Sequence, residues 1–134
     1  LQRAERVVSD CVVVDQNLKV LHPSYLALMA SRAGLLKNIV RNSYLGCCMA
    51  LRRSLLKHVL PLPEHLPYHD WWIGMIAELF GKVTFMNVSL LQYRRHADTT
   101  SQAAGRSRAP VPERLWHRVL MVGYLVARRF GGAR

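Results

Sequence analysis

The stretch 69–81 constrains the fold most, because it predicts a helix with one buried face and two defined ends. Its apolar side chains recur at the three- and four-residue spacing of an amphipathic helix, at Trp72, Met75, Ile76, Leu79 and Phe80. Pro67 precedes this run and Gly81 follows it, so the sequence predicts a helix over residues 71–80. Asp70 then falls at or next to the N-cap, where free backbone N–H groups and the helix dipole favour a carboxylate.

The first residues of this helix allow both a structural and a chemical interpretation. Asp70 either caps the helix only, or serves as a general base that the helix holds at an active site. Trp71 and Trp72 either both pack in the core, or leave one ring exposed to contact a ligand. The local sequence does not decide between these alternatives.

Length and charge narrow the class of protein. The 134 residues, of which 51% are hydrophobic, are enough for a single globular domain with a core. The net charge of +11 suits an anionic partner, namely nucleic acid, a nucleotide diphosphate or an acidic lipid surface. The chain begins with Leu1 and its first residues already run into a predicted strand, so we expect a piece of a longer protein.

The cysteines and histidines exclude two common kinds of site. Cys11, Cys47 and Cys48 are odd in number and two are adjacent, which is no disulfide framework and suits a reducing, cytosolic setting. His65 and His69 are four residues apart, but Pro67 between them spoils a shared helical face, so we expect no zinc site there.

The remaining periodicity predicts alternating strands and helices. The β-branched run 7–14 indicates a buried strand with the polar pair Ser9-Asp10 in its middle, and a buried Asp10 needs a partner or lines a site. Further strands are predicted at 18–21, at 82–88 and at 90–95, and a loop with Gly46 is expected to enter a buried strand ending near residue 51. Short helices are predicted at 25–29, 35–40 and 54–60, and a polar loop at 97–112.

A last helix is predicted over residues 113–130, and it is too charged to span a bilayer. Its apolar face should pack on the domain or on a membrane surface, and consists of Leu115, Val119, Val122 and Val126. The basic side chains are expected to point outward, at Arg114, His117, Arg118, Arg128 and Arg129.

Six short motifs, in this order and spacing, resemble the C-terminal half of a bacterial family 2 glycosyltransferase, especially rhamnosyltransferase-like members that build cell-surface polysaccharides. The resemblance covers roughly residues 7–101, and the motifs are Asn42, Gly46-Cys47, Pro61-x-Pro63, His69-Asp70-Trp71-Trp72, Gly81-x-Val83 and Tyr93-Arg94-x-His96. The resemblance implies an α/β fold, the C-terminal part of a glycosyltransferase A fold with a mixed sheet and flanking helices. Residues 1–101 would be the acceptor-and-base half of that domain, and residues 102–134 a polar loop and a basic amphipathic helix.

The resemblance also assigns roles to residues. Asp70 would be the catalytic base, and His96 would help to hold Mg²⁺ or Mn²⁺ or the diphosphate. Gly46 and Cys47 would line the acceptor side, and Arg94 would screen the phosphates; Trp71 and Trp72 are the candidates for stacking on the acceptor sugar. If Asp70 and His96 serve one site, their side chains should lie roughly 8–12 Å apart.

The family pattern is incomplete in this chain. The nucleotide loop and the Asp-x-Asp metal motif that family members carry in their N-terminal half have no counterpart here. We therefore expect an inverting transferase fragment that is inactive alone, with a nucleoside-diphosphate sugar as donor and a saccharide or lipid-linked saccharide as acceptor. The expected location is the cytoplasm, with contact to the inner face of the membrane left open.

The competing interpretation is a non-catalytic basic module that binds nucleic acid or an anionic membrane surface. Arg106-x-Arg108 and Arg128-Arg129 favour it. Against nucleic acid, the basic residues are spread along the chain and are not interleaved with aromatic side chains that could stack on bases. No nucleic acid partner is therefore expected.

Overall fold

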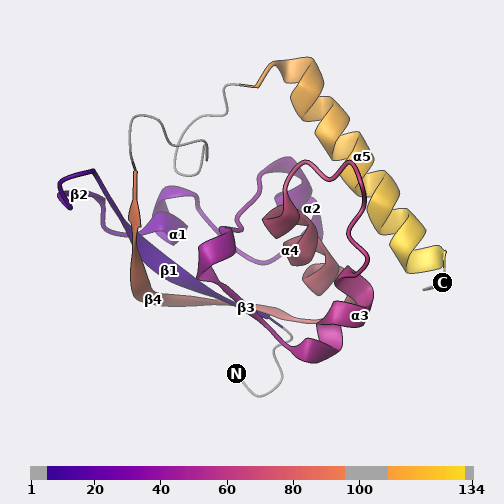
Figure 1. Cartoon of the computed structure of the whole chain (residues 1–134), viewed down its shortest axis with the longest axis horizontal. Coiled ribbons are helices and arrows are strands. Elements are labelled where there is room, and N and C mark those ends of the chain that lie inside the picture. The colour runs from indigo at the N-terminus through magenta and orange to yellow at the C-terminus, as the bar shows by residue number, and fades with distance from the viewer. Residues whose placement is uncertain (1–5, 96–108, 132–134) are drawn as a thin grey trace.

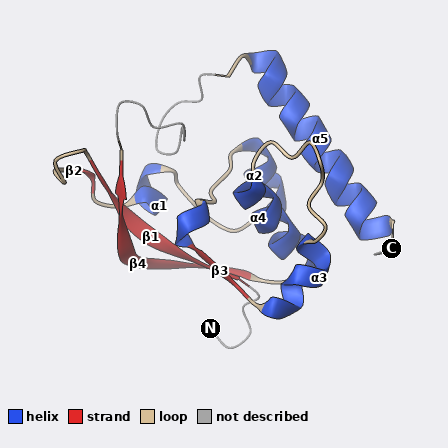
Figure 2. Cartoon of the chain, in the orientation of Figure 1, coloured by secondary structure: helices blue, strands red, loops and turns tan. Residues whose placement is uncertain are grey.

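The protein has an α/β architecture in which helices cover a mixed sheet (Figures 1 and 2). The computed structural model describes residues 6–95 and 109–131. The central strand is β1 (Arg6–Val14), and the long strand β4 (Val83–Arg94) runs parallel to it along one edge. Two short strands share its other edge, both antiparallel: β3 (Met49–Leu51) pairs with the beginning of β1 and β2 (Val20–His22) with its end.

The predicted strand at 7–14 is confirmed as β1, and the two strands predicted at 82–88 and 90–95 are one continuous strand. Its register slips at the predicted break, because Met86 pairs with Ser9 whereas Ser89 pairs with the next residue, Asp10. The residues between bulge out of the ladder, which is how a strand accommodates a polar interruption without ending. The prediction of a buried strand ending near residue 51 is wrong, since β3 is a short edge strand that is partly exposed.

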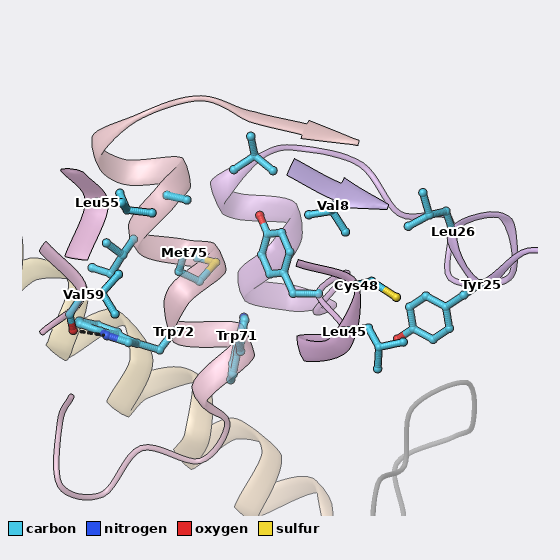
Figure 3. Close-up of a cluster of buried hydrophobic side chains, with 14 of the residues drawn as sticks. Val8, Tyr25, Leu26, Leu45, Cys48, Leu55, Val59, Trp71, Trp72 and Met75 are labelled. Atoms are coloured by element: carbon cyan, nitrogen blue, oxygen red, sulfur yellow. Dashed lines mark hydrogen bonds between the residues drawn. The ribbon is translucent and has the colours of Figure 1, made fainter. Parts of the chain in front are cut away.

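Helices lie on one side of the sheet in Figure 1 and enclose the core against it. Apart from the C-terminal helix, the longest of them is α4 (His69–Phe80), which confirms the predicted central helix. The others are short: α1 (Tyr25–Leu28), α2 (Leu35–Val40) and α3 (Leu56–Val59), with single 3-10 turns at η1 (Gly46–Cys48) and η2 (Arg53–Leu55). Val8 from the sheet, Met75 from α4 and Leu55 from η2 belong to the core cluster drawn in Figure 3.

The C-terminal helix α5 (Val111–Phe130) forms an outer layer, packed on α2 and α4 on the side away from the sheet (Figure 1). Of the two contacts predicted for its apolar face, packing on the domain is wrong. Met121 and Leu125 are the buried residues of this helix, whereas the predicted face is exposed at Leu115, Val119, Val122 and Val126. Among the described helices, none is long and apolar enough to cross a bilayer.

Two arginines of α5, predicted to point outward, explain this orientation. Arg118 Nη2 donates a hydrogen bond of 2.6 Å to the carbonyl of Val40, the last residue of α2. Arg128 donates to the carbonyls of His58, Leu60 and Pro61, at and just after the end of α3. Both guanidinium groups therefore satisfy carbonyls that have no partner within their own helix, at the negative end of the helix dipole.

Candidate functional site

Asp70 is the second residue of α4 and is half-buried. The N-cap is Tyr68, whose side chain makes no capping hydrogen bond, so the expectation that Asp70 lies at or next to the N-cap is corrected by one position. Its Oδ1 accepts a hydrogen bond of 2.7 Å from the backbone N–H of Trp71. The carboxylate thus sits in the first turn, where the helix dipole stabilises its negative charge.

The turn η1 packs directly against this first turn of α4. A Cβ atom at Gly46 would lie 3.4 Å from His69 Nε2, 3.6 Å from Asp70 Cβ and 4.0 Å from Asp70 Oδ2. Two motifs that are separated in the sequence, Gly46-Cys47 and His69-Asp70, therefore meet in the fold. Because Gly46 has no side chain, the space beside the carboxylate that a larger residue would fill stays open.

The exposed Cys47 lies next to this carboxylate. The pKa of its thiol is raised to about 11, first by the surrounding protein atoms that desolvate it and then by the neighbouring Cys48, with a smaller contribution from Asp70. A thiol with a raised pKa stays protonated at neutral pH and is a poor nucleophile. Cys47 can therefore line a site as a small polar side chain, but its environment does not activate it for covalent chemistry.

Tyr25 has a buried hydroxyl that senses the charge of Asp70. This buried residue opens α1, and the pKa of its hydroxyl is raised mainly by burial and further by the negative charge of Asp70, with a contribution from Tyr93. Asp70 and Tyr93 thus both lie within electrostatic reach of one hydroxyl. Arg94 follows Tyr93 as the exposed last residue of β4, so its predicted role in screening phosphates stays a prediction.

The prediction that Trp71 and Trp72 offer a sugar platform is not supported. Both are buried, and their indole N–H groups donate to main-chain carbonyls, Trp71 to Asn38 at 2.7 Å and Trp72 to Val59 at 3.0 Å. Figure 3 shows the Trp72 bond and both rings among the core side chains. A buried ring with a satisfied N–H group is a packing element, so these two residues anchor α4.

Asp10 likewise has a structural role. Its Oδ1 accepts hydrogen bonds from the backbone N–H groups of Cys11 and Leu26, at 2.8 and 3.0 Å, and its Oδ2 accepts one of 2.5 Å from Ser24 Oγ. Ser24 in turn caps α1. The buried carboxylate therefore ties the short α1 to the middle of β1, and both of its oxygens are used in doing so.

Sequence reasoning missed a buried cation close to the site. Arg6, the first residue of β1, is only 1% exposed, and its guanidinium lies 4.2 Å from the centre of the Tyr44 ring. One oxygen of Glu78, Oε1, accepts hydrogen bonds from the Tyr44 hydroxyl at 2.7 Å and from the backbone N–H of Gly34 at 2.8 Å. The sequence signal was a single arginine opening an apolar strand, but its partners are remote in the chain.

Burial is costly for this cation. Desolvation lowers the pKa of Arg6 to about 10, although the neighbouring Tyr44, Asp70 and Glu78 act in the opposite direction. Among the described residues, none accepts a hydrogen bond from its guanidinium. The buried guanidinium of Arg6 thus lies within electrostatic reach of Asp70.

The described residues do not supply a metal site by themselves. Within residues 6–95 and 109–131, no three His, Cys, Asp or Glu side chains are placed to hold one ion together. His96, the predicted metal ligand, lies outside the described residues, so its distance from Asp70 and its role stay predictions.

Comparison of the chain with protein-family models, with curated proteins and with solved structures finds no match in any of the three. What the site can do chemically therefore rests on its own geometry. That geometry consists of a half-buried carboxylate in a helix's first turn, beside a glycine backbone and within reach of a buried cation. Such a carboxylate can accept a proton from a hydroxyl group bound next to it.

Proposed function

We propose that this chain is the acceptor-and-base half of an inverting glycosyltransferase of the family 2 type, with the C-terminal part of a glycosyltransferase A fold. The observation that carries the proposal is the contact between Gly46 and Asp70. It joins the segment expected to line the acceptor side to the residue expected to act as base. The mixed α/β sheet with covering helices is compatible with that fold.

In the proposed reaction, Asp70 takes the proton of an acceptor hydroxyl as its oxygen attacks the anomeric carbon of the donor sugar. The new bond between oxygen and carbon forms while the bond to the nucleoside diphosphate breaks on the opposite side of that carbon. The nucleoside diphosphate leaves with the electron pair, and the configuration at the carbon inverts. A positioned base of this kind contributes about 10²–10⁴-fold to the rate.

The donor would be a nucleoside-diphosphate sugar and the acceptor a saccharide or lipid-linked saccharide. Gly46 and Cys47 would contact the acceptor, and Arg94 would screen the diphosphate. His96 would contribute one ligand to Mg²⁺ or Mn²⁺, together with acidic residues of a nucleotide-binding half. Because the described residues hold no complete ligand set, the proposal assigns the metal no step.

The test is sugar transfer by a protein that carries this chain joined to a nucleotide-binding half. Release of nucleoside diphosphate would be followed with a panel of nucleoside-diphosphate sugars, with and without saccharide acceptors. The proposal expects release that depends on an acceptor and a product of inverted configuration. A chain preceded by an unrelated domain, or a joined protein that transfers no sugar from any donor of the panel, would overturn it.

A further inference from the structure

The outer face of α5 carries a continuous row of exposed apolar side chains. We call this row the α5 stripe; its members are Val111, Leu115, Val119, Val122, Val126 and Phe130. They follow one another at intervals of three or four residues, so they share one side of the helix. Their exposure ranges from 40% at Val122 to 82% at Phe130, which is unusual for a whole helix face of apolar residues.

A neighbouring side of the helix is fixed to the domain, so the stripe cannot simply rotate inward. Met121 and Leu125 are buried, and Arg118 and Arg128 are bonded to carbonyls of the body of the protein. The ring of His117 also meets the ring of Tyr68 edge-on at 6.1 Å. The outward direction of the stripe therefore follows from contacts on that neighbouring side.

We propose that the α5 stripe binds the surface of an anionic lipid bilayer, with the helix lying in the plane of the interface. A helix that binds in this way combines an apolar face with arginines or lysines beside it. In α5, four arginines accompany a single acidic residue, Glu113; Arg114 and Arg129 are both exposed, and the guanidinium of Arg129 lies 5.6 Å from the centre of the Phe80 ring. The exposed Trp116 adds an amphipathic ring of the kind enriched at membrane interfaces.

Charge and area both favour a bilayer over a protein partner. The chain has a net charge of +11, which repels a second copy and attracts acidic headgroups. A helix of 20 residues is about 30 Å long, and a strip about 10 Å wide offers roughly 300 Å² of surface. A stable protein interface needs about 800 Å² from each partner, whereas shallow insertion into a bilayer needs only the stripe.

The position of α5 gives this contact a consequence for the candidate site. Tyr68, which contacts His117 of α5, is the N-cap of α4 and lies two residues before Asp70. A bilayer bound to the stripe would thus hold the start of α4 near the membrane, where a lipid-linked saccharide would be presented. This last step rests on the proposed function, but the lipid contact does not.

The test is flotation of the full chain with vesicles of phosphatidylglycerol and phosphatidylcholine, compared with vesicles of phosphatidylcholine alone. We expect binding to the anionic vesicles that weakens steeply with added salt. The double variant Val119→Glu/Val122→Glu should bind at least roughly tenfold less, because two apolar side chains are replaced by charges. The variant Arg114→Gln/Arg129→Gln should lose about fivefold for each charge removed.

The matched control is Val88→Glu/Leu90→Glu, which places the same charges on exposed apolar positions of β4 and should leave vesicle binding unchanged. Circular dichroism establishes that each variant is folded, and all four substituted valine and leucine positions are exposed. The proposal is overturned if the folded wild-type chain does not float with anionic vesicles, or if the β4 control loses as much binding as the stripe variant. It is also overturned if the stripe substitutions abolish a dimer and leave vesicle binding intact. None of these readouts involves sugar transfer, so failure of the proposed function would not affect them.

Discussion

Gly74 in α4 has no room for an added methyl group. A Cβ atom there would lie 2.1 Å from Tyr44 Cδ2 and 2.5 Å from Arg6 Nη1. Gly123 in α5 is the natural comparison, since nothing lies within 4 Å of its added Cβ atom. Alanine substitutions at the two glycines therefore distinguish the effect of steric crowding from the effect of helix propensity.

We expect Gly74→Ala to lower the free energy of unfolding by about 1–3 kcal/mol, because Tyr44 and Arg6 must move. Gly123→Ala should raise the free energy of unfolding by about 0.5–1 kcal/mol, since alanine has a higher helix propensity than glycine at an exposed position. Urea denaturation of the two variants measures both. A Gly74→Ala variant as stable as the Gly123→Ala variant would contradict the close contact with Tyr44.

Arg6 is a second residue for which the structure predicts the direction of the change in stability on substitution. Arg6→Met should raise the free energy of unfolding by about 1–3 kcal/mol, because a buried cation without a hydrogen-bond partner among the described residues is replaced by an apolar chain. Glu78 keeps its bonds to Tyr44 and Gly34 in this variant. A loss of stability on denaturation would show that the cation–π contact with Tyr44 outweighs desolvation.

The pH dependence of this difference follows from the pKa of Arg6, which burial lowers from its usual value to about 10. Above about pH 10, the folded state can release the proton that the unfolded state still binds, so the wild-type protein gains stability with rising pH. The advantage of Arg6→Met should therefore be full at neutral pH and shrink above about pH 10. Denaturation curves of both proteins at matched pH values cancel the titration of other groups.

At the scale of elements, α5 depends on its two bonded arginines. Arg128 donates to three carbonyls and lies 5.3 Å from the centre of the Trp72 ring, so Arg128→Met should lower the free energy of unfolding by about 1–3 kcal/mol. Arg129 is exposed and only approaches the Phe80 ring, so Arg129→Met should cost about 0.5 kcal/mol at most. Equal effects of both substitutions on urea denaturation would refute the capping role of Arg128.

Periodicity predicts elements well where the apolar pattern of the element itself matches its burial. The helix at α4 was predictable because its apolar residues recur at helical spacing, and the strand at β1 because its β-branched run is buried along almost its whole length. The side of α5 that packs on the domain was not predictable. The valines form the more hydrophobic side of the helix, but the orientation of α5 depends on hydrogen bonds to carbonyl groups at the ends of α2 and α3. Those acceptors leave no trace in the sequence of α5 itself.

The candidate site was predictable in the same limited sense. The family resemblance implied that Gly46 lines the acceptor side and that Asp70 is the base, and the structure places these two residues in contact. The aromatic pair and Arg6 were not predictable, since their burial depends on contacts with Asn38, Val59 and Tyr44 from distant segments. Polarity alone favoured an exposed Arg6 and allowed an exposed tryptophan.

At the scale of the whole molecule, we expect this chain alone to bind nucleoside-diphosphate sugars weakly or not at all. No nucleotide loop or Asp-x-Asp motif occurs in its sequence, and the described residues hold no metal-binding cluster. Titration calorimetry with a panel of such sugars and Mn²⁺ measures this directly. Micromolar binding by the isolated chain would mean that it contains a nucleotide site of its own.

The central claim is that Asp70 is a general base and more than a stabilising residue of a helix's first turn. The measurement that tests it is kcat of Asp70→Asn in a protein that joins this chain to a nucleotide-binding half, alongside the free energy of unfolding. The matched control is Glu113→Gln, which removes the acidic residue from the first turn of α5. Each substitution should cost about 0.3–1 kcal/mol of stability at most, through the helix dipole.

We predict that Asp70→Asn lowers kcat by about 10²–10⁴-fold with little change in donor KM, while Glu113→Gln leaves kcat unchanged. A folded Asp70→Asn enzyme with wild-type kcat would reduce Asp70 to a structural residue and contradict the account.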